Sequence, residues 1–205
     1  MLVFAAITPH PPIILPQIGG SDLAKVKKTV MAMKKLSKIF EKSRPEKVLI
    51  ISPHPSPEHG AQVPLYYLMK NHKSLPVEEL SITFDSNRNH YQWGQKEGKK
   101  IKENPKRTAF VASGDLSHCL KADGPYGFNP AGPLFDKKLI ELIKKKDIKG
   151  ILDLDPNLIE NAAECGLRSI CFLFGILEEQ KFKPEILSYE GPFGVGYLVA
   201  NFKIY

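Results

Sequence analysis

The first fifty residues predict a strand, a helix and a second strand, and this pattern constrains the fold more than any other feature. The apolar run LVFAAI at 2–7 is rich in strand formers and stops at Thr8. From Ser21, the expected helix cap, apolar residues recur every three or four positions as far as Arg44, and KVLIIS at 47–52 predicts the next strand. A crossover of this kind is almost always right-handed and makes its two strands parallel.

We therefore expect one α/β domain over residues 1–205, with three α/β/α layers and a central sheet that is largely parallel or mixed. A chain of 205 residues, of which 42% are hydrophobic, can bury one substantial core. The apolar segments 108–113 and 196–202 are further candidates for core strands. The segment 169–177, SICFLFGIL, is apolar on nearly every face, which predicts a largely buried helix.

Each of the first two predicted strands is followed by a histidine between two prolines. His10 stands in TPHPP and His54 stands in SPHPSP. Because the carboxyl ends of parallel strands meet at one edge of a sheet, we expect the two imidazoles to share a crevice. The prolines restrict the backbone on both sides of each histidine. Two such displays favour a shared metal over two incidental turn residues.

A third predicted strand leads into SGDLSH, which offers Asp115 and His118 at the same edge of the sheet. Gly114 permits a sharp turn there. The alternative interpretation is that Asp115 caps a short helix and that His118 is incidental. The remaining histidines have no such setting and receive no role: His59, His72 and His90.

The segment 160–180 places an acidic residue and a thiol at the start of the buried helix. Glu164 and Cys165 would gain there from the helix dipole, which is one explanation for their presence. A carboxylate that heads a buried helix needs a partner, and a metal held by His10 and His54 would supply one. Cys165 is the rival donor, since a thiolate would shift the preference toward zinc or a redox role.

The net charge of +7 does not by itself indicate a nucleic-acid partner. The lysines alternate with apolar residues at helical spacing, as on solvated helix faces, and no aromatic residues are interleaved with them as a stacking platform. No apolar run approaches the roughly 18–20 residues that span a bilayer, and the N-terminus lacks a secretory-signal pattern. We expect a cytoplasmic protein that binds neither nucleic acid nor membrane, with its three cysteines as free thiols.

Taken together, the motifs resemble a known superfamily. TPHPP, SPHP, SGDLSH and NAAECGLRS, followed by SYEGPFGVGYLVANF, are similar to class III extradiol ring-cleavage dioxygenases in their catalytic B-subunit form and to Memo-like proteins. The nearest resemblance is to the dioxygenase-like part of AmmeMemoRadiSam system proteins. It covers nearly the whole chain and includes the order of the motifs.

The resemblance implies a mononuclear non-heme iron(II), held by His10, His54 and Glu164. It further implies that His118 acts as the acid and base, with Asp115 orienting it. A catechol-like aromatic substrate and O₂ are the implied reactants, because two imidazoles and one carboxylate leave open positions on iron(II).

The resemblance also leaves the third ligand open. In Memo-like proteins a cysteine before a glycine matches Cys165, and relatives that bind zinc make His118 itself a candidate ligand. Three function classes follow: a ring-cleaving dioxygenase, a zinc-dependent hydrolase on the same scaffold, and a metal-binding or redox protein that works with a radical-SAM partner. The resemblance leaves open whether the protein forms a homo-oligomer or works with a partner protein of the AmmeMemoRadiSam system.

Overall fold

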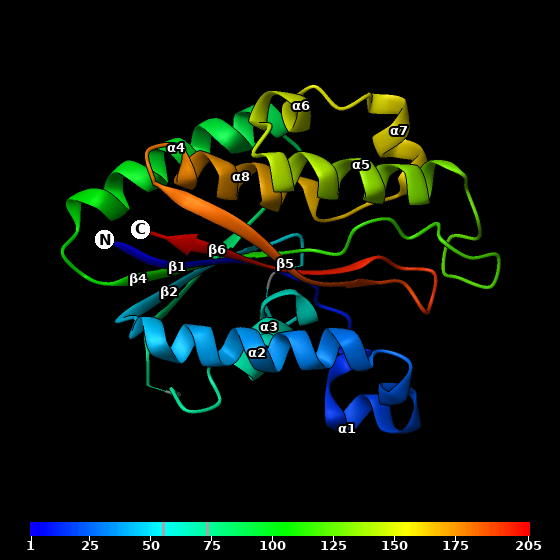
Figure 1. Cartoon of the computed structure of the whole chain (residues 1–205), viewed down its shortest axis with the longest axis horizontal. Coiled ribbons are helices and arrows are strands. Elements are labelled where there is room, and N and C mark those ends of the chain that lie inside the picture. Colours follow the sequence, from blue (N-terminus) through cyan, green and yellow to red (C-terminus); the bar gives the residue numbers. More distant parts are fainter. Residues whose placement is uncertain (55, 73) are drawn as a thin grey trace.

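Six strands form one sheet through the middle of the molecule, in the spatial order β3-β2-β4-β1-β6-β5 (Figure 1). The computed structural model describes residues 1–54, 56–72 and 74–205. The strands are β1 (Leu2–Thr8), β2 (Lys47–Ser52), β3 (Val77–Ser81), β4 (Thr108–Ser113), β5 (Phe182–Glu190) and β6 (Tyr197–Ile204). β3, β2, β4 and β1 run parallel, whereas β6 is antiparallel to both β1 and β5. The sheet is therefore mixed, and the four predicted core strands are confirmed.

Helices cover both faces of this sheet, as the three-layer prediction requires. α2 and α3 lie on one face, and α4, α5 and α8 lie on the other (Figure 1). The helices are α1 (Pro16–Gly19), α2 (Lys27–Ser43), α3 (His59–Leu68), α4 (Asn87–Glu103), α5 (Ala131–Lys145), α6 (Ile148–Leu152), α7 (Pro156–Ala162) and α8 (Leu167–Leu177), with 3-10 turns at Pro12–Ile14 and Gly20–Ala24. None of the helices in the described ranges is long and apolar enough to cross a membrane.

The central strands are mostly apolar because each buries side chains on both faces. On one face, Phe4 of β1 meets Phe40 of α2 edge to face, with ring centroids 5.3 Å apart. On the other face, Phe110 of β4 stacks on Phe172 of α8 at 5.5 Å. All four rings are buried, so each helical layer is held to the sheet by its own aromatic contact.

The structure corrects the predicted start of the first long helix. The expected cap at Ser21 lies inside the 3-10 turn Gly20–Ala24, and α2 begins only at Lys27. Val26, which separates the two, is fully buried and has a backbone outside the helical region, with φ −108° and ψ 25°. The break at Val26 divides what the apolar spacing alone predicts as one continuous helix.

The segment 160–180 is likewise not one helix. α7 ends at Ala162, Ala163 adopts a left-handed backbone with φ 49°, and α8 begins after Gly166. Glu164 and Cys165 therefore lie in a tight turn between two helices and not in the first turn of α8. α8 itself is buried over most of its length, as predicted.

The strand order decides where the functional loops meet. β4 pairs with β1 on one side and with β2 on the other, with Thr8 opposite Ser113 and Ile51 opposite Ala112. The carboxyl ends of these three parallel strands are therefore neighbours, and the loops after them share one edge of the sheet. Pro55, the second proline of the SPHP motif, lies outside the described residues.

Candidate metal centre

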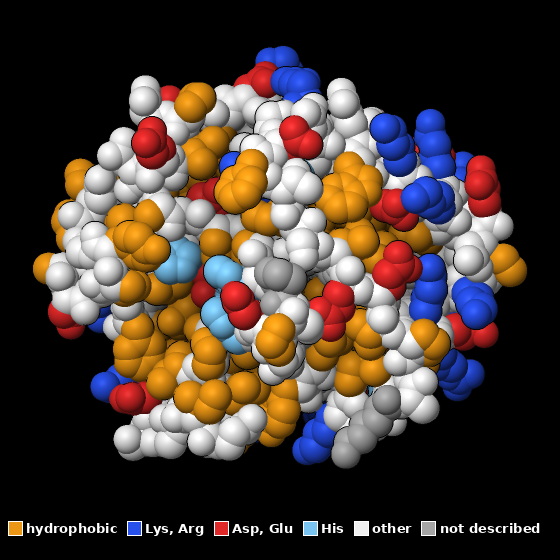
Figure 2. Space-filling view, turned by 180° about the vertical axis from the view of Figure 1, so that it is seen from behind, with side chains coloured by type: hydrophobic (Ala, Val, Ile, Leu, Met, Phe, Trp, Pro, Cys, Tyr) orange, Lys and Arg blue, Asp and Glu red, His pale blue; other side chains and the backbone are white. Residues whose placement is uncertain are grey.

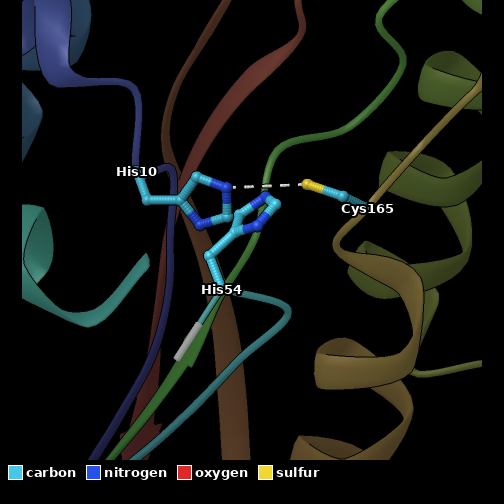
Figure 3. A group of neighbouring side chains, drawn as sticks. All are labelled: His10, His54 and Cys165. Atoms are coloured by element: carbon cyan, nitrogen blue, oxygen red, sulfur yellow. Dashed lines mark hydrogen bonds between the residues drawn. The ribbon is translucent and has the colours of Figure 1, made fainter. Parts of the chain in front are cut away.

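Two histidines and one cysteine from three separate loops meet at this edge of the sheet. His10 follows β1, His54 follows β2, and Cys165 comes from the turn before α8 (Figure 3). One potential ligand atom from each residue lies within 4.8 Å of the other two. His10 Nε2 and Cys165 Sγ are 3.6 Å apart, and the imidazole centroids are 5.1 Å apart. The two proline-flanked histidines do share one crevice.

Ser113, the last residue of β4, sets the tautomer of His10. Its hydroxyl donates to the carbonyl oxygen of Gly60 and lies 3.0 Å from His10 Nδ1. A hydroxyl has one proton to donate, so towards His10 it must accept, and Nδ1 must carry the imidazole proton. The lone pair is then on Nε2, the atom that faces Cys165. A metal ligand held in this way keeps both its orientation and its tautomer.

Cys165 reaches the histidines because two glycines allow the backbone to cross closely. A Cβ added to Gly114 would lie 2.2 Å from the Cα of Gly166, so only hydrogen fits there. The crossing brings the backbone N–H of Asp115 to 3.2 Å from Cys165 Sγ, where it donates a hydrogen bond to the sulfur. Gly114 thus serves a close backbone approach and not only the sharp turn expected from the sequence.

Asp115 contacts His10, whereas the resemblance suggested that it orients His118. Asp115 Oδ1 accepts a hydrogen bond of 3.1 Å from the backbone N–H of His10, and Oδ2 lies 3.9 Å from His10 Nε2. Asp115 does not cap a helix either, because residues 114–118 form no helix. Burial raises the pKa of Asp115 to about 7.

His118 is oriented by backbone carbonyls of the turn that carries Cys165. Its Nδ1 lies 2.7 Å from the carbonyl oxygen of Ala163, and its backbone N–H donates to Ala162. A carbonyl can only accept, so Nδ1 is protonated and Nε2 is free to accept a proton. The His118 ring meets the ring of Tyr126 edge to face at 5.7 Å. Burial lowers the pKa of His118, which favours the neutral imidazole.

Glu164 points elsewhere, although it is the neighbour of Cys165. Its carboxylate accepts a hydrogen bond of 2.5 Å from the backbone N–H of Leu167 at the start of α8. It also lines a separate cavity of about 630 Å³ with Arg88 and Arg168. Burial raises the pKa of Glu164 to about 7. The structure does not bring this carboxylate to His10 and His54, and Cys165, the alternative donor, stands in that place.

Sequence reasoning left out a third histidine of this cluster. His59 is the first residue of α3, and its ring centroid lies 5.2 Å from that of His10 and 4.8 Å from that of His54. Its position five residues after His54 in SPHPSPEHG was the only signal available, and that signal is weak without the fold.

The charge states of the donors fit a cation at this place. Burial and the neighbouring imidazoles lower the pKa of His10 well below its usual value, so His10 is neutral and can offer a lone pair. Burial, followed by the Asp115 charge, raises the pKa of Cys165 well above its usual value. A bound divalent metal would offset the cost of ionising this buried thiol, because a coordinating thiol loses its proton. Two imidazoles and a thiolate suit zinc, iron or copper.

The cluster is reachable from outside. Figure 2 shows histidine side chains in a hollow of the surface, bordered mainly by hydrophobic side chains with some acidic ones. His10 is almost fully buried, with 1% of its surface exposed, whereas the side chain of His54 is 36% exposed. A small molecule can therefore approach from the His54 side.

An α/β fold with histidine-bearing loops at the carboxyl ends of its parallel strands defines a candidate metalloenzyme. The family model described as the catalytic LigB subunit of aromatic ring-opening dioxygenase matches residues 55–200, which is most of the chain. The protein belongs to this family.

Two known proteins show how far the similarity extends. Protein CA_C1420 of Clostridium acetobutylicum is 30% identical over 266 aligned positions, which cover 97% of this chain and 57% of that protein. The alignment is longer than the 205 residues here, so the relative contains internal residues without a counterpart in this chain. The uncharacterized protein JW3007 from Escherichia coli K12 shares the fold, with a TM-score of 0.57, 13% identity and coverage of 97% and 99% of the two chains.

Proposed function

We propose that the protein binds one divalent transition metal through His10, His54 and Cys165 and acts as an extradiol-type dioxygenase on a catechol-like aromatic. The observation that carries the proposal is the convergence of three potential donors from three loops within 4.8 Å. Membership of the ring-opening dioxygenase family supports the reaction type. Iron(II) is the proposed metal in the cell, and zinc is the alternative.

The chain's own residues provide the proton chemistry. Iron(II), when bound, would supply Lewis acidity and would relay electrons from the aromatic, which is the reductant, to O₂. His118 Nε2 accepts the proton of a substrate phenol, because its Nδ1–H is already held by Ala163. Tyr126, whose ring lies against His118, forms an aromatic wall of the proposed substrate site.

The donor set also favours a second candidate function. A thiolate in place of the carboxylate matches the Memo-like proteins that the sequence resembles, and it makes the site softer than two imidazoles and a carboxylate would be. On this reading the protein is a metal-binding or redox partner of a radical-SAM protein. The two candidates share the metal site and differ only in whether an aromatic is oxidised there.

Metal analysis of anaerobically purified protein, combined with oxygen uptake on a panel of catechols, tests both candidates. We expect one metal per chain, loss of that metal in His10→Ala, His54→Ala and Cys165→Ser, and retention in Glu164→Gln, the matched control. Oxygen uptake that depends on a catechol supports the dioxygenase. Stoichiometric metal without any such uptake favours the second candidate. Full metal binding by Cys165→Ser together with loss in Glu164→Gln returns the third ligand to the carboxylate.

A further inference from the structure

The described residues between β2 and α3 place two more polar side chains beside His54. The backbone N–H of His54 donates to the hydroxyl of Ser52 at 3.1 Å. Gly60 packs directly on this turn: a Cβ there would lie 2.4 Å from the carbonyl oxygen of His54. The start of α3 is therefore pressed against the His54 backbone, which places Glu58 and His59 beside its imidazole.

Glu58 and His59 contact different parts of that imidazole. Glu58 Oε2 lies 3.4 Å from His54 Nδ1. The ring of His59 lies over the ring of His54 at a tilt of 34°, with centroids 4.8 Å apart, and meets His10 edge on at 5.2 Å. Glu58 thus lies beside a nitrogen of the His54 ring, and His59 lies over its face.

His54 needs such support more than His10 does. His10 is 1% exposed and is held by Ser113 and Asp115, whereas the His54 side chain is 36% exposed. A partly exposed imidazole on a loop loses rotamer freedom when it binds a metal, and preorganisation reduces that cost. A carboxylate beside Nδ1 also favours the tautomer with the proton on Nδ1 and the lone pair on Nε2.

We propose that Glu58 and His59 form a clamp that positions the imidazole of His54 for metal binding. The inference rests on the proposed metal site and adds two positioning residues to it. Glu58 acts by holding its negative charge beside Nδ1–H, and His59 acts by packing against the ring without coordinating. Its nitrogens do not belong to the group of potential donor atoms that lie within 4.8 Å of one another.

The test is zinc affinity, measured by competition with a chromophoric chelator on the full chain. We expect Glu58→Gln and His59→Ala each to bind zinc about 10–100-fold more weakly, the usual loss when a partner of a metal-ligating histidine is removed. Glu58→Asp and His59→Phe should recover part of the affinity, because they restore a carboxylate and a flat ring. The matched controls are Glu179→Gln, whose carboxylate pairs with Lys102, and His72→Ala, whose ring packs on Phe40; neither should change the affinity.

The visible spectrum of the cobalt(II)-loaded protein provides the second readout. If the clamp positions His54, the ligand field changes in Glu58→Gln and returns in Glu58→Asp. Equal zinc loss in His59→Phe and His59→Ala would make His59 a ligand and overturn its positioning role. Unchanged affinity and spectrum in Glu58→Gln and His59→Ala would overturn the clamp while leaving the metal site intact. A wild-type protein that binds no zinc, cobalt or iron would overturn the proposed site as well.

Discussion

At the scale of single residues, hydrogen bonds to Nδ1 leave the other ring nitrogen of His10 and of His118 free. Ser113 holds Nδ1 of His10 and Ala163 holds Nδ1 of His118, and both partners can only accept there. In the neutral imidazoles of both residues, Nε2 therefore carries the lone pair. In the first case the lone pair faces Cys165, and in the second it is available to a substrate proton.

Ser113→Ala removes the acceptor for His10 Nδ1 and should weaken zinc binding about 10–100-fold. The imidazole would then exchange tautomers and turn more freely, so that the lone pair on Nε2 is no longer held towards the metal site. Ser188→Ala is the matched control, because the hydroxyl of Ser188 is buried and has no hydrogen-bond partner in the described part of the chain. Chelator competition measures the zinc affinity of both variants. Equal affinities would show that Ser113 does not position the His10 imidazole for metal binding.

His118→Ala should lower the catechol-dependent turnover about 10²–10⁴-fold, the usual contribution of a positioned acid or base. Metal content should stay near that of the wild type, because His118 is not a member of the group His10, His54 and Cys165. Metal analysis and single-turnover kinetics on the same preparation separate the two effects. A parallel loss of metal would instead make His118 a ligand.

At the scale of elements, the turn between α7 and α8 connects both halves of the site. Its Ala163 carbonyl holds His118, and its Cys165 sulfur faces His10. The turn is pressed onto the loop after β4 through Gly114 and Gly166, which leave no room for a side chain between them. A small shift of this contact should therefore disturb the Cys165 thiol and the His118 imidazole together.

Substitution of these two glycines should give a graded response. The Cβ of Gly114→Ala would meet the backbone of Gly166 at 2.2 Å, whereas the Cβ of Gly166→Ala would meet the Asp115 carbonyl oxygen at 2.9 Å. Overpacking usually costs about 1–3 kcal/mol, so we expect the larger loss of stability and of metal in Gly114→Ala. Urea unfolding and zinc titration of the pair provide the check. The reverse order would mean that the crossing does not limit the position of Cys165.

At the scale of the whole molecule, a buried carboxylate joins the α5 layer to the sheet and to the loop before His118. Asp136 of α5 is fully buried and accepts hydrogen bonds from the backbone N–H of Ser117 at 2.8 Å and from the Tyr189 hydroxyl of β5 at 2.6 Å. Burial nevertheless raises the pKa of Asp136 to about 6. The folded protein therefore takes up a proton here more readily than the unfolded chain does.

This raised pKa predicts the direction of a pH effect on stability. A group whose pKa is higher in the folded state stabilises the fold below its unfolded value of 3.8, and this contribution disappears as the pH rises through about 6. Because one pKa unit is worth about 1.4 kcal/mol, the free energy of unfolding of the wild type relative to Asp136→Asn should fall by up to about 3 kcal/mol between pH 4 and pH 7. Urea unfolding of both proteins across this range measures it. A flat difference would show that Asp136 has an ordinary pKa.

The strands, the layers and the edge of the sheet where His10, His54, Asp115 and His118 gather could be predicted from the sequence. Hydrophobic periodicity is a local property, and parallel strand ends meet wherever such strands pair. The fold was needed to show that Cys165, and not the adjacent Glu164, lies beside His10 and His54, and that His59 lies there too. Both outcomes depend on contacts between segments far apart in the chain, Gly114 with Gly166 and Ser113 with Gly60. No local pattern encodes such contacts, because neighbouring side chains in a tight turn can face opposite sides.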